Sequence, residues 1–253
     1  RAKTEIFEGL QSGGEVCLFG DDDKLATVNE VAGKPPVFFG EGEACQVRGE
    51  IMNNLGLKGS VCAIHTESGS FEVTVPLPGK HMVTNALAAT AVGLVFGMEL
   101  SHIQKGIAGV KAVSGRSNLI HTDKITIIDD CYNANPVSVK AALSLLREAK
   151  GRRVALLGDM FELGENEKML HYEVGAYAAA LGTDVICCIG ALSRNTFTGA
   201  KEYPGSKEIE VYHYDTKAAF LEEMSNRIAT GDSVLVKASH GMHFEELVEK
   251  MQA

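Results

Sequence analysis

Polar side chains follow directly after an apolar segment that the sequence predicts to be a β-strand. Asp129 and Asp130 come first, and the amides Asn133 and Asn135 follow within the next five residues. Carboxylates and amides at a strand end can hold sugar hydroxyls or the water shell of a metal ion. Asn135 has an alternative interpretation as the cap of a helix that begins at Pro136.

A second polar group, residues 237–243, follows the last predicted strand and leads into a helix. A serine in such a turn is typical of hydrolases, but Lys237 stands where their G-x-S-x-G motif requires glycine. His240 and His243 lie three residues apart, and no further zinc ligands stand near them in the sequence. Lys237, Ser239 and the backbone amides of the turn are better suited to hold a carboxylate or a phosphate.

Two further groups lie earlier in the chain. His81 and Asn85 are four residues apart in an Ala-rich helical segment, so they share one helix face and could contact a planar ligand together. The alternative is a helix start with a solvated Asn85. Arg116, directly after Gly115, carries a planar and permanently charged guanidinium group that can bind a nucleotide phosphate. The loop 158–164 lacks the G-x-G-x-x-G pattern, which disfavours a dinucleotide fold of the dehydrogenase type.

The elements that must position these residues change in kind near residue 115. Before it, short β segments occupy residues 15–78, and two helical segments follow, 83–97 and 101–110. After it, apolar strands alternate with helices five times, which predicts a doubly wound parallel sheet with helices on both faces. Ligands bind such sheets at the carboxyl ends of the strands, where the polar groups of this second part should meet. The strands predicted there are 125–128, 154–157, 185–189, 208–212 and 234–236, and the helices are 136–149, 167–181, 216–228 and 244–251, with a short one from residue 193.

The composition of the 253-residue chain excludes several classes of protein. Lys and Arg number 24 against 33 Asp and Glu, a net charge of −9 that argues against a nucleic-acid partner. The most apolar stretch, residues 86–98, is too short to cross a bilayer, so we expect no membrane insertion. The six cysteines show no C-x-x-C spacing and no signal peptide is visible, which predicts reduced thiols and a cytoplasmic location. We further expect a monomer.

Together these segments resemble the Mur ligases, ATP-dependent enzymes that form the amide bonds of the peptidoglycan peptide stem. The resemblance rests on Asp-Asp-x-Tyr-Asn-Ala-Asn-Pro at 129–136, on Leu-Gly-Asp-Met-x-Glu-Leu-Gly at 157–164 and on a nearly kept Lys-Gly-Ser-His-Gly-Met at 237–242. It covers essentially the whole chain. It implies an α/β fold in which residues 1–114 are the C-terminal part of a central ATPase domain, a β-rich piece plus helices. Residues 115–253 are then a Rossmann-like, doubly wound C-terminal domain.

The resemblance also implies an activity. ATP would phosphorylate the terminal carboxylate of UDP-N-acetylmuramoyl-tripeptide, and the amine of D-alanyl-D-alanine would attack the acyl phosphate, with Mg²⁺ offsetting phosphoryl charge. A G-x-x-G-K-[ST] phosphate loop is absent from the sequence. We therefore expect a C-terminal fragment that is inactive alone, with the loop that binds the ATP phosphates upstream of Arg1. Two alternatives stay open: a sister amide ligase that adds a different amino acid, and a non-catalytic α/β binding module.

Single residues receive roles from the same resemblance. Lys3 matches the lysine that the family carbamoylates, and a carbamate there would bind Mg²⁺ through oxygen; Lys3 and His81 are thus expected to be catalytic. Asn85 matches the asparagine that contacts adenine, Arg116 the arginine that reaches ATP from the interdomain hinge, and Asp130 the aspartate that binds ribose. The residues expected to contact the substrates are Asn133, Asn135, Lys237, Ser239 and His240.

Three positions depart from the family pattern. Met82 replaces an asparagine of His-Asn-x-x-Asn, Gly20 replaces the first asparagine of Asn-x-Asp-Asp, and Ala238 replaces a glycine. None of these changes removes a charged group.

Overall fold

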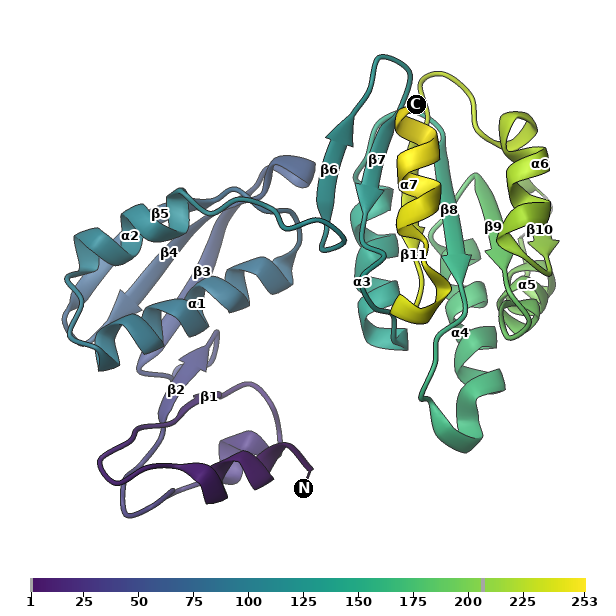
Figure 1. Ribbon diagram of the computed structural model, residues 1–253. Helices are drawn as coiled ribbons and strands as arrows, with labels where there is room; N and C mark the ends of the chain where they lie inside the picture. Colours follow the sequence, from purple (N-terminus) through teal and green to yellow (C-terminus); the bar gives the residue numbers. More distant parts are fainter. Residues whose placement is uncertain (1, 206–207) are drawn as a thin grey trace. The chain divides into compact units, whose positions relative to one another are not determined.

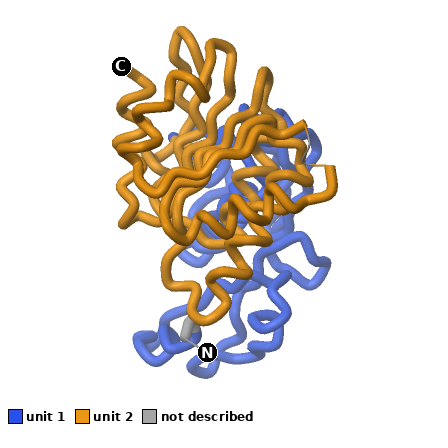
Figure 2. Tube along the Cα trace, turned by 90° about the vertical axis from the view of Figure 1, so that its right-hand side faces the viewer, with its two compact units in different colours: residues 1–111 blue, residues 112–253 orange. Residues whose placement is uncertain are grey.

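The computed structural model describes residues 2–205 and 208–253. The chain divides into two compact units, residues 1–111 and 112–253, and each has its own hydrophobic core (Figures 1 and 2). The division falls close to the change in sequence character near residue 115. None of the helices in the described ranges has the length and apolar composition that a bilayer crossing requires.

The first unit is built on a five-stranded sheet whose strands lie in chain order. The strands are β1 (Cys17–Phe19), β2 (Val37–Gly40), β3 (Val47–Asn54), β4 (Ser60–Thr66) and β5 (Gly69–Val75). The first three run parallel, and β3, β4 and β5 pair antiparallel. Cys62 and Ile64 on β4 are fully buried while their neighbours Val61, Ala63 and His65 are half-buried, so the sheet presents one face to the core.

Two helices cover that face. They are α1 (Lys80–Val95) and α2 (Leu100–Ala108) (Figure 1). Val83 and Leu87 of α1 pack in one cluster with Val47 and Ile64 of the sheet. The remaining short elements are 3-10 turns, namely η1 (Ala2–Gly9), η2 (Leu25–Thr27) and η3 (Gly56–Lys58).

The second unit is built on a six-stranded sheet with the order β10-β9-β8-β11-β7-β6. Its parallel strands are β7 (Thr126–Asp129), β8 (Arg153–Gly158), β9 (Val185–Ile189), β10 (Glu210–Tyr214) and β11 (Ser233–Lys237). The edge strand β6 (Asn118–His121) pairs antiparallel with β7. Strand β6 was not predicted, because its four residues are partly exposed and form no apolar run.

Helices cover both faces of this second sheet. Side chains alternate along β8, so Val154 and Leu156 join the core under α6 (Lys217–Arg227) and α7 (Glu245–Gln252), while Ala155 and Leu157 face the other side. That other side carries α3 (Pro136–Arg147), α4 (Glu167–Ala180) and α5 (Ser193–Glu202) (Figure 1). The doubly wound α/β fold predicted from the sequence is confirmed.

Helices α4 and α5 pack against one another through glycines. A Cβ atom at Gly199 would overlap the carbonyl oxygen of Tyr172, and one at Gly175 would overlap the carbonyl oxygen of Thr196. The backbones of the two helices therefore meet directly, and this contact admits no larger residue without separating them.

Candidate functional site

The carboxyl ends of three neighbouring strands bring the polar groups of the second unit together. In the register of the sheet, Val236 lies beside Asp129 and Lys237 beside Leu157. The segments that leave β7, β8 and β11 therefore start from one edge, as expected for a sheet of this type. The turns η4 (Gly164–Asn166) and η6 (His240–Met242) follow β8 and β11 at this edge.

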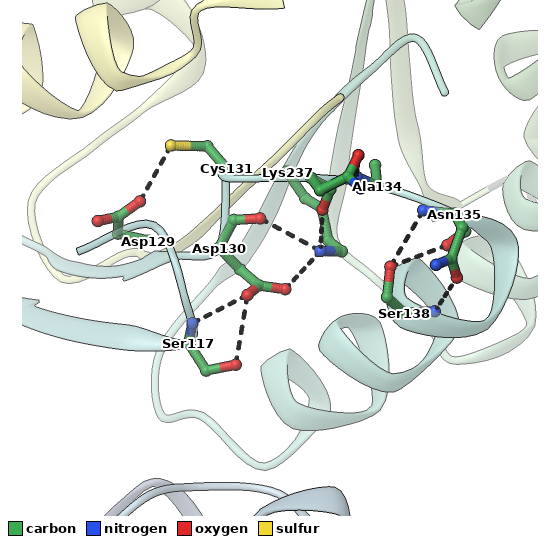
Figure 3. Close-up of polar contacts among 9 residues, drawn as sticks. Ser117, Asp129, Asp130, Cys131, Ala134, Asn135, Ser138 and Lys237 are labelled. Carbon is green, nitrogen blue, oxygen red and sulfur yellow. Dashed lines mark hydrogen bonds and ion pairs between the residues drawn. The ribbon is translucent and has the colours of Figure 1, made fainter. Parts of the chain in front are cut away.

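Lys237 is buried in this cluster, with a side chain only 2% exposed. Its Nζ atom lies 2.6 Å from Oδ2 of Asp130 and donates to the carbonyl oxygens of Asp130 (3.2 Å) and Asn133 (2.9 Å), as Figure 3 shows. An ammonium group has three donors, and all three are engaged. Lys237 thus ties the end of β11 to the segment after β7. Its expected contact with a substrate requires this cluster to open.

Both carboxylate oxygens of Asp130 are also held. Oδ2 faces Lys237, and Oδ1 accepts from the backbone nitrogen of Ser117 (2.9 Å) and from its hydroxyl (3.4 Å) (Figure 3). The side chain is 16% exposed. A carboxylate offers about four lone-pair sites, so one acceptor site remains for a ribose hydroxyl. The ribose role of Asp130 stays a prediction.

Asp129 holds protein groups rather than a ligand. Oδ2 accepts from the Gly115 nitrogen (2.7 Å) and the Ser114 hydroxyl (3.3 Å), and Oδ1 accepts from Sγ of Cys131 (3.1 Å). Burial and the hydrogen bond to Asp129 raise the pKa of the Cys131 thiol far above its usual range. The thiol therefore stays protonated and is not a nucleophile.

The two asparagines after this pair have local partners. Asn135 begins α3 with a capping box: its Oδ1 accepts from the Ser138 nitrogen (2.9 Å), and its own nitrogen donates to the Ser138 hydroxyl (3.1 Å). Oδ1 of Asn133 accepts from the Ala134 nitrogen (2.8 Å). The capping interpretation of Asn135 thus describes its geometry, and substrate contacts by either amide stay predictions.

Ser239 and His240 differ in exposure although they are neighbours. Ser239 is buried, and its hydroxyl accepts from the Phe161 nitrogen (2.8 Å), which joins the end of β11 to the loop after β8. His240 is exposed, and its ring lies 5.3 Å from that of Tyr132 and 6.0 Å from that of His243. Among the substrate-binding residues predicted in the segment after β11, His240 is therefore the one that a ligand can reach.

Two further residues hold the loop after β8, and the sequence did not single out the second of them, His171. Asp159 is buried and accepts from the Ser193 nitrogen (2.7 Å) and hydroxyl (2.6 Å) at the start of α5. His171 is fully buried in α4, and its Nε2 accepts from the Met160 nitrogen (2.9 Å). The sequence shows only that these residues are polar, because their partners lie 34 and 11 residues away.

Backbone strain gathers at the same edge. Ser117, Glu162 and His243 have positive φ angles of 48°, 63° and 52°, and among the described residues only one other non-glycine residue, Ala32, does so. A left-handed backbone costs an L-residue roughly 1–2 kcal/mol. Such strain clusters at functional sites, and here it lies in or beside the segments that hold the polar cluster.

In the first unit, the predicted residues lie on an open helix surface. His81 and Asn85 are both exposed near the start of α1, on the side away from the buried Val83 and Leu87. Nδ2 of Asn85 lies 3.6 Å from Sδ of Met82, the residue that departs from the family pattern. The side chain of Lys3 lies outside the described residues, so its catalytic and metal-binding roles stay predictions.

The described residues offer no cluster suited to a metal ion. No group of three or more His, Cys, Asp or Glu side chains converges among them. Asp129 and Asp130 do not form a Mg²⁺ site either, because protein donors contact all four of their carboxylate oxygens and Asp129 is buried.

Comparison with known protein families gives two matches that follow one another along the chain. The model described as "Mur ligase middle domain" matches residues 1–93, and "Mur ligase, glutamate ligase domain" matches residues 115–240.

Curated relatives match over nearly the whole chain. The UDP-N-acetylmuramoyl-tripeptide--D-alanyl-D-alanine ligase of Bacillus subtilis (strain 168) is 34% identical over 255 residues, which cover 99% of this chain and 54% of that protein. The enzyme of the same name from Escherichia coli (strain K12) is 33% identical over 258 residues, covering 100% of this chain and 55% of that protein. The chain thus spans about half the length of these relatives.

Solved structures agree with these matches. A crystal structure of MurF from Acinetobacter baumannii superposes with a TM-score of 0.87 at 31% identity and covers 100% of this chain and 54% of that one. The MurF ligase of Thermotoga maritima in complex with ADP has a TM-score of 0.77 at 23% identity, covering 99% of this chain and 56% of that one, a likeness of fold.

Proposed function

Because the chain belongs to the Mur ligase family, we propose that it is part of an ATP-dependent ligase that joins D-alanyl-D-alanine to UDP-N-acetylmuramoyl-tripeptide. The observation that carries the proposal lies after β7. Two of the three residues that family resemblance gives to the nucleotide, Arg116 and Asp130, are brought together there by the hydrogen bonds from Ser117 to Asp130. They are 14 residues apart in the sequence, and the fold makes them neighbours.

The proposed reaction has two bond-forming steps. The terminal carboxylate of the tripeptide attacks the γ-phosphorus of ATP, the bond to the leaving oxygen breaks, and ADP departs. The amine of D-alanyl-D-alanine then attacks the acyl carbon, loses a proton, and expels inorganic phosphate as the amide forms. Negative charge builds on phosphoryl and acyl oxygens in both steps, so fixed cationic donors stabilise the transition states.

The residues of this chain would contribute binding and orientation. The Arg116 guanidinium supplies planar donors for a phosphate, Asp130 accepts a hydrogen bond from a ribose hydroxyl, and Asn85 contacts the adenine. His81 shares the helix surface of Asn85, and the exposed His240 faces an incoming substrate. Mg²⁺ would neutralise phosphoryl charge when bound, but the carboxylates described after β7 do not supply its ligands.

The activity of the full-length gene product is the first test. We expect phosphate release that depends on both UDP-N-acetylmuramoyl-tripeptide and D-alanyl-D-alanine, with single amino acids inactive in place of the dipeptide. Activity with a single amino acid would identify a sister amide ligase instead. Binding of substrates without turnover would favour a non-catalytic binding module.

Asp130 tests the nucleotide assignment within that enzyme. Asp130→Ala should weaken ATP affinity by about tenfold, the effect of losing one hydrogen bond to a charged group. An unchanged ATP affinity would remove Asp130 from the nucleotide site. The 253-residue chain alone should show no turnover.

The cellular location and oligomeric state belong to the same proposal. All six cysteines are free, and four of them are buried, which supports a reducing compartment such as the cytoplasm. We propose a monomer, which light scattering on the purified protein will test.

A further inference from the structure

Arg116 lies in a tight turn that closes on itself. Its backbone nitrogen donates to the Val113 carbonyl oxygen (3.0 Å), and the two residues form an isolated antiparallel bridge. The side chain is exposed, and within the described part of the chain Arg116 forms no ion pair. The turn therefore presents a charged group that other protein charges do not hold.

Both neighbours of Arg116 are fastened to the segment after β7. The Gly115 nitrogen donates to Oδ2 of Asp129 (2.7 Å), and the Ser117 nitrogen donates to Oδ1 of Asp130 (2.9 Å). The Gly115 carbonyl oxygen in turn accepts from the Tyr132 nitrogen (3.0 Å). Three backbone groups of Gly115 and Ser117 thus hold the turn against the segment after β7.

The side chain of Arg116 is held by a ring rather than by a carboxylate. Its Cζ atom lies 4.1 Å from the centroid of the Tyr132 ring. A guanidinium that stacks on an aromatic face keeps its five N–H donors in the plane, pointing outward. Tyr132 therefore restricts the Arg116 side chain without using any of the donors that a phosphate needs.

The Tyr132 side chain has close neighbours on two sides, Gly115 and His240. Gly115 has a φ angle of 76°, and a Cβ atom there would lie 3.1 Å from Cβ of Tyr132, so glycine allows the close approach of the two segments. On the other side, the His240 ring lies 5.3 Å from the Tyr132 ring. The Tyr132 side chain is still 49% exposed at the edge of the sheet.

We propose that Tyr132 is a positioning residue that holds the Arg116 guanidinium ready for a nucleotide phosphate. The inference rests on the proposed function, since it takes the nucleotide role of Arg116 from it. Without the ring, the long arginine side chain samples many rotamers, and each must be given up when the phosphate binds. The hydroxyl of Tyr132 plays no part in this role, because the contact is made by the face of the ring.

The test compares three variants of the full-length ligase by kcat/KM for ATP. Tyr132→Phe keeps the ring and should stay within about twofold of the wild type. Tyr132→Leu removes the ring and should lower kcat/KM by roughly two- to fivefold, the range of cation–π contacts near a surface. Tyr172→Leu on α4 removes another partly exposed tyrosine and serves as the control, with no change expected.

A double-mutant cycle separates positioning from direct contact. Arg116→Gln alone should lower kcat/KM further than Tyr132→Leu, and the double variant should fall no lower than Arg116→Gln, because the ring acts only through the arginine. Effects that multiply in the double variant would overturn the proposal and show that Tyr132 acts on the ligand itself. A wild-type value for Tyr132→Leu would also overturn it. Full activity of Arg116→Gln would instead remove the nucleotide role of Arg116, on which the proposal rests.

Discussion

The second unit buries part of its candidate site, whereas the two candidate residues on α1 of the first unit are exposed. In the second unit, Asp129, Lys237 and Ser239 are between 2% and 4% exposed, and each is bonded to other parts of the same unit. In the first unit, His81 and Asn85 lie on the exposed surface of α1. Burial and hydrogen bonds thus fix the geometry of the second group, whereas the first group is open to solvent.

The difference follows from the two sheets. The second sheet is covered on both faces, so polar groups at its strand ends enter a buried setting and must be paired. The first sheet has helices on one face only, and the polar residues of α1 remain on its outer side. Stability and site geometry should therefore be coupled in the second unit and independent in the first.

The substitutions with the largest expected difference in stability replace one lysine in each unit. Lys237→Met leaves Asp130 without its buried partner and should cost about 3–5 kcal/mol in the free energy of unfolding. Lys80→Met breaks the exposed pair with Glu41, in which the lysine is 68% exposed, and should cost less than about 1 kcal/mol. Urea unfolding followed by circular dichroism measures both, since the chain has no Trp. Equal losses in the free energy of unfolding would show that the buried cluster stabilises the fold no more than an exposed ion pair does.

A pair of glycines gives effects of opposite sign. Gly199→Ala forces α4 and α5 apart and should destabilise the second unit by about 1–3 kcal/mol. Gly106→Ala in α2 meets no atom within 4 Å and should stabilise the first unit by about 0.5–1 kcal/mol. Thermal unfolding of the two variants is the measurement. Stabilisation by Gly199→Ala would contradict the direct helix contact.

The cap of α3 has a smaller effect. Asn135→Ala should cost about 1 kcal/mol, while Asn135→Ser keeps a capping oxygen and should cost little. The same variants decide whether Asn135 also contacts a substrate. If it does, Asn135→Ser loses ligase activity although its stability is kept; equal activity would leave capping as its role.

The smallest effect is a dependence of stability on pH. Burial alone would raise the pKa of Asp184, but hydrogen bonds from the Arg153 side chain and backbone outweigh it and hold the pKa below its usual value. The folded state therefore gains stability above about pH 4, the unfolded pKa, and loses it as the pH falls through the lower folded value. Asp184→Asn should cost less than about 1 kcal/mol at pH 7, because the side chain is 39% exposed, and progressively less as the pH falls through the lowered pKa of the folded state. A constant cost across this range would rule out the ionised pair.

Much of the architecture was predictable from local sequence. Continuous apolar runs such as residues 185–189 mark strands buried on both faces, and that prediction matches β9 residue for residue. Edge strand β6 was missed because pairing with β7 defines it, and pairing leaves no pattern in a half-exposed segment.

The site was only partly predictable. The types of residue at the strand ends showed which segments carry polar chemistry, but not which side chains are buried. Lys237 and Asp130 lie 107 residues apart. Only the structure shows that the charged groups of the two side chains pair with each other. Tyr132 stands within a recognised motif, yet its stacking on Arg116 depends on a turn 16 residues earlier, which no local spacing indicates.

The three left-handed residues beside the strand ends have a consequence for attempts to make a more heat-resistant protein. Glycine at Ser117, Glu162 or His243 would relax the backbone. Selection for heat resistance alone should therefore yield substitutions at these positions early. The same exchange would free the segments that the polar cluster now holds in place. Heat tolerance obtained there should come with slower turnover, and an engineer should look for it in α2 or on the outer helix surfaces instead.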